Sequence, residues 1–228
     1  MAVSGSNDFE LDVADYVEEA YERCGLEIRT GYDLKTATRS LNLMLADWAN
    51  RGLNRWTMTQ TSTTLTSGTA TYTLGADTID ILSAVIRTGS DSTQSDIALS
   101  RISRDAYLSI TNKNTTGRPT QFYVDRQINP IVKLWPTPDS VDTYTLVFDR
   151  LVRMDDADSS INTLDVPFRF YPCLAAGLAY YIALKKAPER VQILKAVYEE
   201  EFERAASEDR DRATLSLTPS RDYYTFIS

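Results

Sequence analysis

The side chains that most often carry out catalysis are scarce in this sequence. None of the 228 residues is histidine, which excludes catalytic triads with an imidazole base and zinc sites with histidine ligands. The two cysteines, Cys24 and Cys173, lie far apart, and neither belongs to a C-x-x-C pair. Because each falls on the apolar side of an expected helix, we interpret both as buried free thiols.

Clustered carboxylates between Asp155 and Ser160 are the kind of ligand that hard cations favour. A calcium loop also needs a central glycine, which is missing, and a glutamate at position twelve, where counting from Asp156 gives Pro167. The sequence contains neither a G-x-x-x-x-G-K-[ST] loop nor a G-x-G-x-x-G turn for binding phosphates. We therefore predict no metal, no cofactor and no enzymatic activity.

The charge balance argues against a surface that grips nucleic acid. Lys and Arg number 24 and Asp and Glu 32, a net charge of −8, whereas phosphate-binding surfaces are basic. Arg51, Arg55 and Trp56 do bring basic and aromatic side chains together. We expect Trp56 to pack in a core or between domains rather than against a base.

Membrane insertion and secretion are not expected from the sequence. No apolar run approaches the roughly 20 residues that a membrane span requires. Residues 1–8 lack the basic and hydrophobic regions of a signal peptide. We therefore expect the chain to remain on the side of the membrane where it is made.

Helical periodicity is strong in the first fifty residues. One stripe can be capped by Asn7 or Asp8 and ends at Gly25, and a second follows a cap at Asp33 and ends at Gly52. The two helices are expected to pack antiparallel. Their apolar residues are Val13, Tyr16, Val17, Ala20, Tyr21 and Cys24, then Leu34, Ala37, Leu41, Met44, Leu45 and Trp48.

From Trp56 onward the composition favours β-structure. Nine of the seventeen residues from Thr57 to Thr73 are threonine, a β-branched residue that suits strands. Ser67 and Gly68 are expected to divide this stretch into a hairpin, and Ser103 to cap a short helix. Further strands are predicted at Ile79–Arg87, Ser95–Arg101, Thr120–Asp125, Ile131–Trp135 and Thr143–Leu151.

Two more helices are predicted after a polar loop over residues 155–165. Pro167 and Pro172 restrict the first of them to residues after about 170, because proline is tolerated only in a first turn. Pro188 suits the first position of the second. The run Glu199–Glu203 is interpreted as its solvated face.

The order of two helices, several strands and two helices predicts an α+β fold. Each helical pair has too few partners by itself, so we expect residues 8–55 and 155–213 to form one four-helix bundle. Residues 56–154 are then an inserted antiparallel β-sandwich or barrel. Residues 214–228 form an extended C-terminal tail.

Several segments, taken in order, carry a family resemblance. They are Leu41–Trp56, Tyr72–Asp77, Gly117–Tyr123, Leu134–Pro138, Gly177–Tyr181 and Pro188–Arg190. Together they resemble head-to-tail adaptor proteins of tailed bacteriophages, a family that includes the tail-tube A proteins of short-tailed phages. The second segment resembles the family's Y-x-L-P-x-D element, with Gly75 in place of proline.

The resemblance implies a structural protein at the head-to-tail junction of a virion, assembled as a ring of twelve copies. Its partners would be the portal protein, the tail or nozzle proteins, and other copies of itself. Genomic DNA would pass through the centre. Twelve chains at −8 carry about −96, and an acidic channel repels DNA so that it slides without sticking.

The C-terminal tail is apolar for the end of a sequence. Pro219 prevents a continuous helix, and Leu215 and Leu217 have the spacing of one strand face. The tail either folds back on its own subunit or docks on a neighbouring copy or the portal, as the resemblance favours. The predicted partner-binding residues are Leu215, Leu217, Pro219, Tyr223, Tyr224, Phe226 and Ile227.

Two hypotheses from other classes stay open. One is a β-sandwich module that binds a ligand or carbohydrate through tyrosines and tryptophans. The other is a hydrolase with two catalytic carboxylates, whose separation depends on the fold. A ring former would give high-order oligomers in a mass measurement, whereas glycan binding or turnover would favour the rivals.

Overall fold

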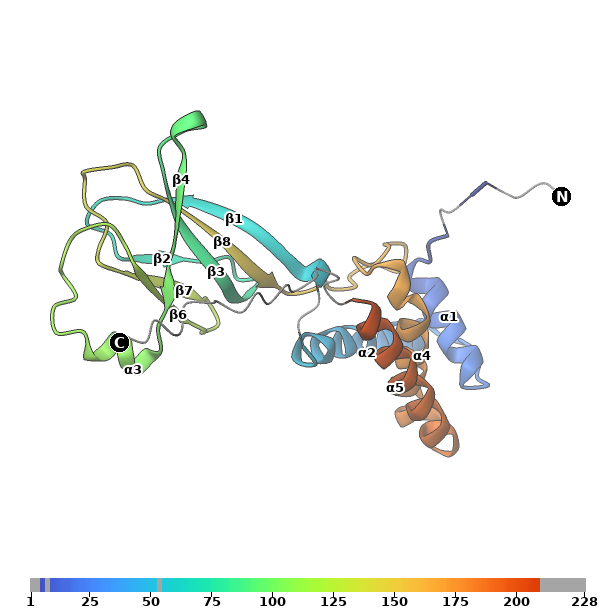
Figure 1. The fold of residues 1–228 in the computed structure, drawn as a ribbon. Coiled ribbons are helices and arrows are strands. Elements are labelled where there is room, and N and C mark those ends of the chain that lie inside the picture. The colour runs from blue at the N-terminus through green and yellow to red at the C-terminus, as the bar shows by residue number, and fades with distance from the viewer. Residues whose placement is uncertain (1–4, 7–8, 53–54, 210–228) are drawn as a thin grey trace, which may run out of the picture.

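The computed structural model describes residues 5–6, 9–52 and 55–209 and shows a helical part joined to a β part (Figure 1). The chain begins in the helices, builds the strands next and then returns to the helices. Segments from both ends of the sequence therefore lie together in the helical part. The predicted α+β class is confirmed.

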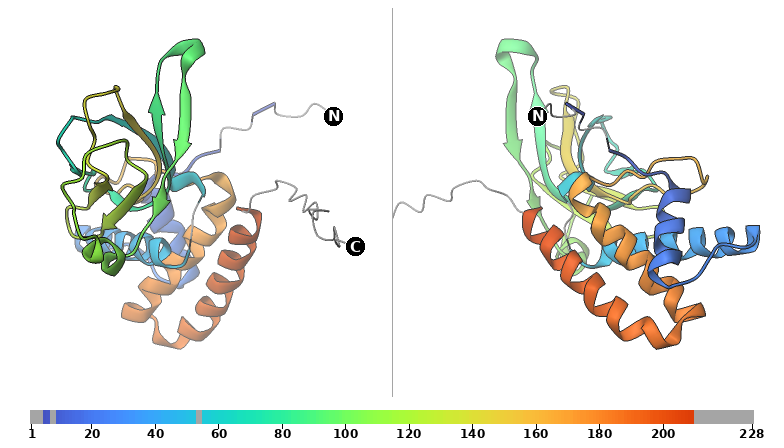
Figure 2. Two further views of the ribbon diagram at one scale, coloured as in Figure 1. Left: turned by 60° about the vertical axis from the view of Figure 1, so that its left-hand side comes forward. Right: turned by 90° about the vertical axis from the view of Figure 1, so that its right-hand side faces the viewer.

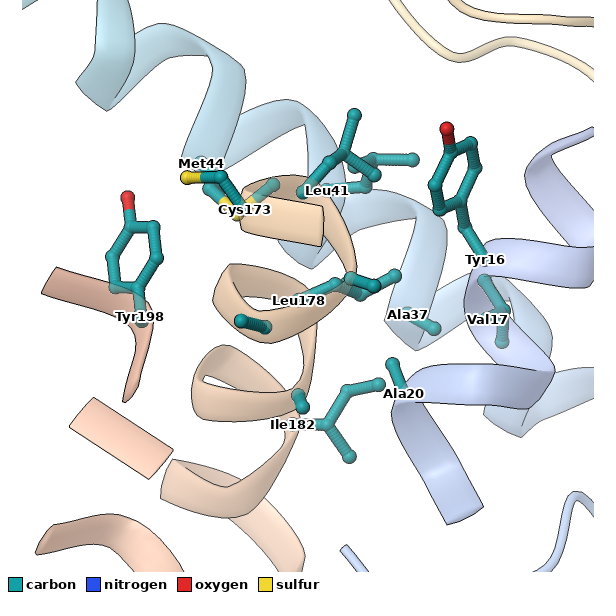
Figure 3. Packing of buried hydrophobic residues seen from close by; sticks show 14 of the residues in the cluster. Tyr16, Val17, Ala20, Ala37, Leu41, Met44, Cys173, Leu178, Ile182 and Tyr198 are labelled. Carbon is teal, nitrogen blue, oxygen red and sulfur yellow. The ribbon is translucent and has the colours of Figure 1, made fainter. Parts of the chain in front are cut away.

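Four long helices share one hydrophobic core around α4. The helix α4 contacts each of the other three, and its buried residues cover most of its length because nearly all of them are apolar (Figure 3). Trp48, Tyr16 and Tyr198 are among the largest side chains that are fully enclosed there. The four helices are α1 (Val13–Arg23), α2 (Gly31–Asn50), α4 (Tyr171–Lys186) and α5 (Val191–Glu208).

The helices do not all run alongside one another. Both views in Figure 2 show α4 and α5 as an antiparallel pair, with α2 running across α1. The predicted antiparallel pairing of α1 with α2 is wrong. Each of these two helices packs mainly on α4, because α4 offers the larger apolar surface.

The first two helices begin at caps other than those expected. Asp12, and not Asn7 or Asp8, caps α1 by accepting a hydrogen bond from a backbone N–H of the first turn. Thr30 caps α2, and Asp33 lies three residues further on, where its carboxylate accepts a hydrogen bond from the Thr30 N–H. Both starts are capping boxes, in which two backbone donors are satisfied reciprocally.

The β part consists of two four-stranded sheets, in the orders β1-β8-β3-β4 and β2-β7-β6-β5. All neighbouring strands are antiparallel except β5 and β6, which are parallel. The strands are β1 (Met58–Thr64), β2 (Thr71–Thr73), β3 (Thr78–Thr88), β4 (Ser95–Ala98), β5 (Ser100–Arg101), β6 (Gln121–Asp125), β7 (Ile131–Trp135) and β8 (Thr145–Val152).

Side chains from both sheets form a second hydrophobic core. Ile81 on β3 and Leu146 on β8 meet Phe122 on β6 and Leu134 on β7, and all four are almost completely buried. Buried and partly buried residues alternate along β7, as expected for a strand with one face in the core. On β6, by contrast, three consecutive residues are buried. The helical and β parts thus each have a core of their own.

Two strand predictions are wrong in their pairing. Ser67 and Gly68 do not close a hairpin, because β1 pairs with β8 and β2 pairs with β7 in the other sheet. The predicted strand over residues 95–101 is divided at buried Leu99, where the chain passes from β4 in one sheet to β5 in the other. Leu99 belongs to the core that the two sheets share, so the chain changes sheet at a residue that is anchored between them.

Short helical turns join the larger elements. The helix α3 (Arg104–Ser109) is capped by Ser103, as predicted. Pro188 begins a 3₁₀ turn that leads directly into α5. The other 3₁₀ turns are Arg55–Thr57, Asp91–Thr93 and Phe168–Phe170. Among the described residues, no helix is both long enough and apolar enough to span a bilayer.

Candidate functional site

The two thiols lie inside the helical part. Cys24 and Cys173 are buried and free, as predicted. The Cys24 thiol donates a hydrogen bond of 3.2 Å to the backbone oxygen of Ala179. Burial raises the pKa of Cys173 to about 12 and also raises the pKa of Cys24. Since the thiolate is the nucleophile, neither site favours covalent chemistry.

The acidic loop is held by contacts within the chain. Asp156 lies 3.8 Å from the Arg153 guanidinium, and the Asp158 carboxylate accepts a hydrogen bond of 2.7 Å from the Asn162 amide. Across the described ranges, no group of three or more cysteine, aspartate or glutamate side chains is placed to hold a metal ion. In the chain, the loop connects β8 to the turn that precedes α4.

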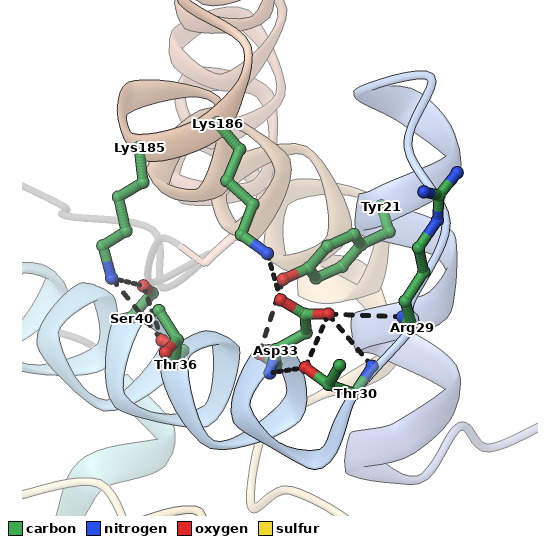
Figure 4. A network of polar contacts seen from close by, with 8 residues as sticks. All are labelled: Tyr21, Arg29, Thr30, Asp33, Thr36, Ser40, Lys185 and Lys186. Atoms are coloured by element: carbon green, nitrogen blue, oxygen red, sulfur yellow. Dashed lines mark hydrogen bonds and ion pairs between the residues drawn. The ribbon is translucent and has the colours of Figure 1, made fainter.

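A polar network fastens the start of α2 to the end of α4 (Figure 4). The Lys186 ammonium donates to the Asp33 carboxylate, which also accepts hydrogen bonds from the Thr30 hydroxyl and the Arg29 backbone N–H. Chiefly through the Lys186 hydrogen bond, the pKa of Asp33 falls to about 2. The neighbouring Lys185 instead donates to the Ser40 hydroxyl at 2.5 Å.

Trp56 lies at the junction of the helical and β parts and packs on the helical core. Its ring centroid is 4.5 Å from that of Phe170, the residue that precedes α4. Within the helical part, the Asn42 side-chain amide on α2 forms hydrogen bonds with the backbone N–H and C=O of Ala157, at 2.8 and 3.1 Å. The structural interpretation of Trp56 is consistent with this packing.

Arg51 is engaged inside the chain and is not presented to a nucleic acid. Its guanidinium donates to both carboxylate oxygens of Glu199, at 2.8 and 3.1 Å, and to Asp47 at 2.8 Å. It also lies over the rings of Tyr198 and Phe202. Arg51 therefore joins α2 to α5.

An acidic groove runs between α1 and α4. Phe9, which is 72% exposed, and Tyr171 provide its aromatic part. On α1, Glu18 and Glu22 lie one turn apart and are exposed. Neither forms an ion pair with any residue that the structure describes.

A second groove, of about 670 Å³, lies between α2 and residues 153–160. Lys35 and Arg39 are exposed on its α2 wall, one turn apart, next to Leu43, which is 57% exposed. Within the described ranges, neither cation forms an ion pair. Both like-charged pairs are visible in the sequence at a spacing of four, but only the fold shows that they are solvent-facing and unpaired.

The β3–β4 hairpin projects away from the rest of the β part in Figures 1 and 2. Residues 89–96 at its tip are all exposed and contain no apolar side chain. Near the tip, the Arg87 guanidinium donates two hydrogen bonds of 2.8 Å to the Asp96 carboxylate. The hairpin is thus a stiffened polar projection.

The predicted partner-binding residues in the tail lie outside the described residues. These are Leu215, Leu217, Pro219, Tyr223, Tyr224, Phe226 and Ile227. The helix α5 ends at Glu208, so the described structure stops close to the point where the tail was expected to begin.

The structure is thus an α+β protein with two packed hydrophobic cores and, on its surface, grooves lined by charged side chains. The family model of the SU10 adaptor proteins matches residues 9–221, nearly the whole chain. The chain belongs to the SU10 adaptor family. Membership supports a role as a phage head-to-tail connector and implies a non-enzymatic function.

Comparison with solved structures found a chain described as "Neck of empty GTA particle computed with C6 symmetry". The two chains are 10% identical with a TM-score of 0.28, over 85% of this chain and 93% of the other. Comparison with curated proteins gave no match. The adaptor prediction is confirmed at the level of the family, and the narrower similarity to tail-tube A proteins stays a prediction.

Proposed function

We propose that this chain is a structural virion protein that forms a ring adaptor between the portal vertex and the tail. Twelve copies surround a channel through which genomic DNA passes during ejection. The observation that carries the proposal is the adaptor-family match over residues 9–221. The protein is made in the bacterial cytoplasm and acts at the head-to-tail junction.

The two separate cores support a division of labour within each copy. We assign residues 8–55 and 155–213 to the unit that builds the ring, and residues 56–154 to an inserted unit that meets neighbouring copies or the tail. The polar tip of the β3–β4 hairpin, residues 89–96, supports this assignment, because it projects beyond the β core and contains none of the residues of that core.

The net charge fits a channel for DNA. Each chain carries −8, so a twelve-membered ring carries about −96 before counterions are considered. An acidic wall repels phosphates, whereas a basic wall would hold them by counterion release. DNA is therefore a passing, non-specific occupant of the proposed channel.

The tail over residues 214–228 is the proposed docking segment. Its aromatic and aliphatic residues would bind a groove on the portal or on a neighbouring copy, and burying them would offset the entropy of ordering the segment. Docking on the same subunit is the competing arrangement, and truncation distinguishes the two.

Electron microscopy of the purified chain mixed with candidate portal rings tests the proposed function. We expect a second ring seated on the portal, with portal rings by themselves as the control. A chain that binds no portal ring and forms no large oligomer at high concentration would overturn the proposal. Specific binding of a glycan by such a monomer would favour the ligand-binding module instead.

A further inference from the structure

The exposed face of α1 carries charges that the subunit leaves unsatisfied. Glu18 and Glu22 are separated by one helical turn, about 6 Å along the axis, and repel each other. Among the described residues, Arg23 is the one cation that lines the same groove, and its guanidinium already binds Glu19 at 2.7 Å. Together with exposed Phe9, this gives a surface that combines negative charge with an aromatic contact.

The exposed face of α2 has the opposite character. Lys35 and Arg39 are also one turn apart, and Leu43 continues the same stripe one turn further on. The two carboxylates on the opposite wall of the groove, Asp156 and Asp158, are held by contacts within their own loop. The cations on α2 therefore face solvent in the isolated subunit.

The two faces have the same spacing of charges, opposite signs of charge, and exposed apolar side chains beside the charges. Each presents two like charges at an i,i+4 spacing with at least one exposed apolar side chain nearby. We infer that the α1 face of one copy, carrying Glu18 and Glu22, docks on the α2 face of the next copy, carrying Lys35 and Arg39.

A contact between two different faces has the geometry that a ring needs. The grooves beside α1 and α2 share no lining residue, so one copy can use both at once, with a different neighbour at each. Such head-to-tail contacts close into a ring when the rotation between copies permits. The inference rests on the proposed ring and names the surfaces that build it.

Charge reversal in two separate proteins tests the pairing. The first variant combines Glu18→Lys with Glu22→Lys, and the second combines Lys35→Glu with Arg39→Glu. Each variant by itself places like charges across every contact, so we expect self-association about 100-fold weaker than that of the wild type. Native mass spectrometry and electron microscopy, at high concentration and on portal rings, measure the assembly.

The decisive experiment is to mix the two variants in equal amounts and to ask whether assembly is restored. The reversed α1 of the first variant then meets the reversed α2 of the second, and the unreversed faces meet likewise, so alternating rings should form. Restoration by mixing requires contact between copies and cannot arise from a change within one subunit. Glu200→Lys with Glu203→Lys, an equal charge change on the exposed side of α5, is the control and should assemble normally.

Reversed variants that each assemble like the wild type, or a mixture that fails to assemble, would overturn the pairing while leaving the proposed ring intact. A wild-type chain that forms no ring under either condition would overturn both. If a reversed variant unfolds, the double variant Glu18→Gln with Glu22→Gln replaces it in the test. This variant should assemble more weakly than the wild type, and its assembly should no longer depend on the salt concentration. Unchanged salt sensitivity would again contradict the pairing.

Discussion

The indole Nε1 of Trp48 donates a hydrogen bond of 2.8 Å to the Tyr198 hydroxyl, joining α2 to α5 across 150 residues of sequence. Both side chains are fully buried in the helical core. Burial raises the pKa of Tyr198, so the phenol remains neutral over the ordinary pH range. The contact holds together the two helical segments that the β part separates in sequence.

Replacing Tyr198 by phenylalanine removes this acceptor and keeps the ring. We expect a loss of about 0.5–1.5 kcal/mol in the free energy of unfolding, the usual net value of one hydrogen bond. Urea unfolding followed by circular dichroism measures it. Tyr32→Phe, at a residue that is 70% exposed, is the matched control and should change little. Equal stability of Tyr198→Phe and the wild type would mean that the hydrogen bond contributes nothing.

Gly177 allows α4 to approach α2 and α5 closely. A Cβ at this position would lie 2.7 Å from Cε2 of Tyr198 and nearer still to Sδ of Met44. Gly177→Ala should therefore destabilise the protein by about 1–3 kcal/mol through overpacking, despite the better helix propensity of alanine. Thermal and urea unfolding measure the change.

Gly31→Ala is the control for this substitution, because a Cβ at the start of α2 meets nothing within 4 Å. It should change the unfolding free energy by no more than about 0.5 kcal/mol. A Gly177→Ala protein as stable as the Gly31→Ala protein would show that the helices have room to separate.

Leu45 and Leu43 lie on opposite sides of α2, at 4% and 57% exposure. Leu45→Ala should cost about 2–5 kcal/mol of unfolding free energy, since it removes core contacts and leaves a cavity. The same change at Leu43 should cost less than about 0.5 kcal/mol in the monomer. Similar melting curves for the two variants would contradict the placement of α2.

The Asp33–Lys186 pair should shape the acid stability of the helical part. The pKa of Asp33 is about 2 in the folded protein against an ordinary 3.8, so folding favours the ionised form. The stabilisation is complete above pH 3.8 and is lost as the pH falls towards 2. Lys186→Met should therefore reduce the dependence of stability on pH in this window.

Lys185→Met is the matched control for acid stability, because Lys185 bonds to Ser40 rather than to a carboxylate. Its stability should fall with acid as steeply as that of the wild type. Unfolding midpoints measured from pH 5 to pH 2 compare the variants across the window where carboxylates titrate, about pH 4 in the unfolded chain. Equal slopes for Lys186→Met and Lys185→Met would exclude the proposed coupling.

Removing residues 214–228 tests the docking tail. We expect an unchanged melting temperature and loss of attachment to portal rings, because the tail is proposed to bind a partner and not the subunit core. A variant with Tyr223, Tyr224 and Phe226 replaced by alanine should behave in the same way while keeping the chain length. Normal docking, or failure to fold, would contradict the docking role.

The sequence by itself determined where most elements lie. The strand predicted over Ile131–Trp135 has the same bounds in the structure, and Leu41, Leu45 and Trp48 are buried as their helical spacing indicates. Such local features are readable because side-chain direction repeats every two residues in a strand and every 3.6 in a helix. The α+β class follows from the order of these elements.

Only the tertiary structure decided which elements meet. The turn at Ser67 and Gly68 reverses the chain, yet β1 pairs with β8 and β2 with β7, because backbone hydrogen bonds carry no information about their partner. Lys186 likewise meets Asp33 across 153 residues, a pairing that the local spacing of residues does not reveal. Partners are selected by which apolar faces can be buried together, and that depends on the whole chain at once.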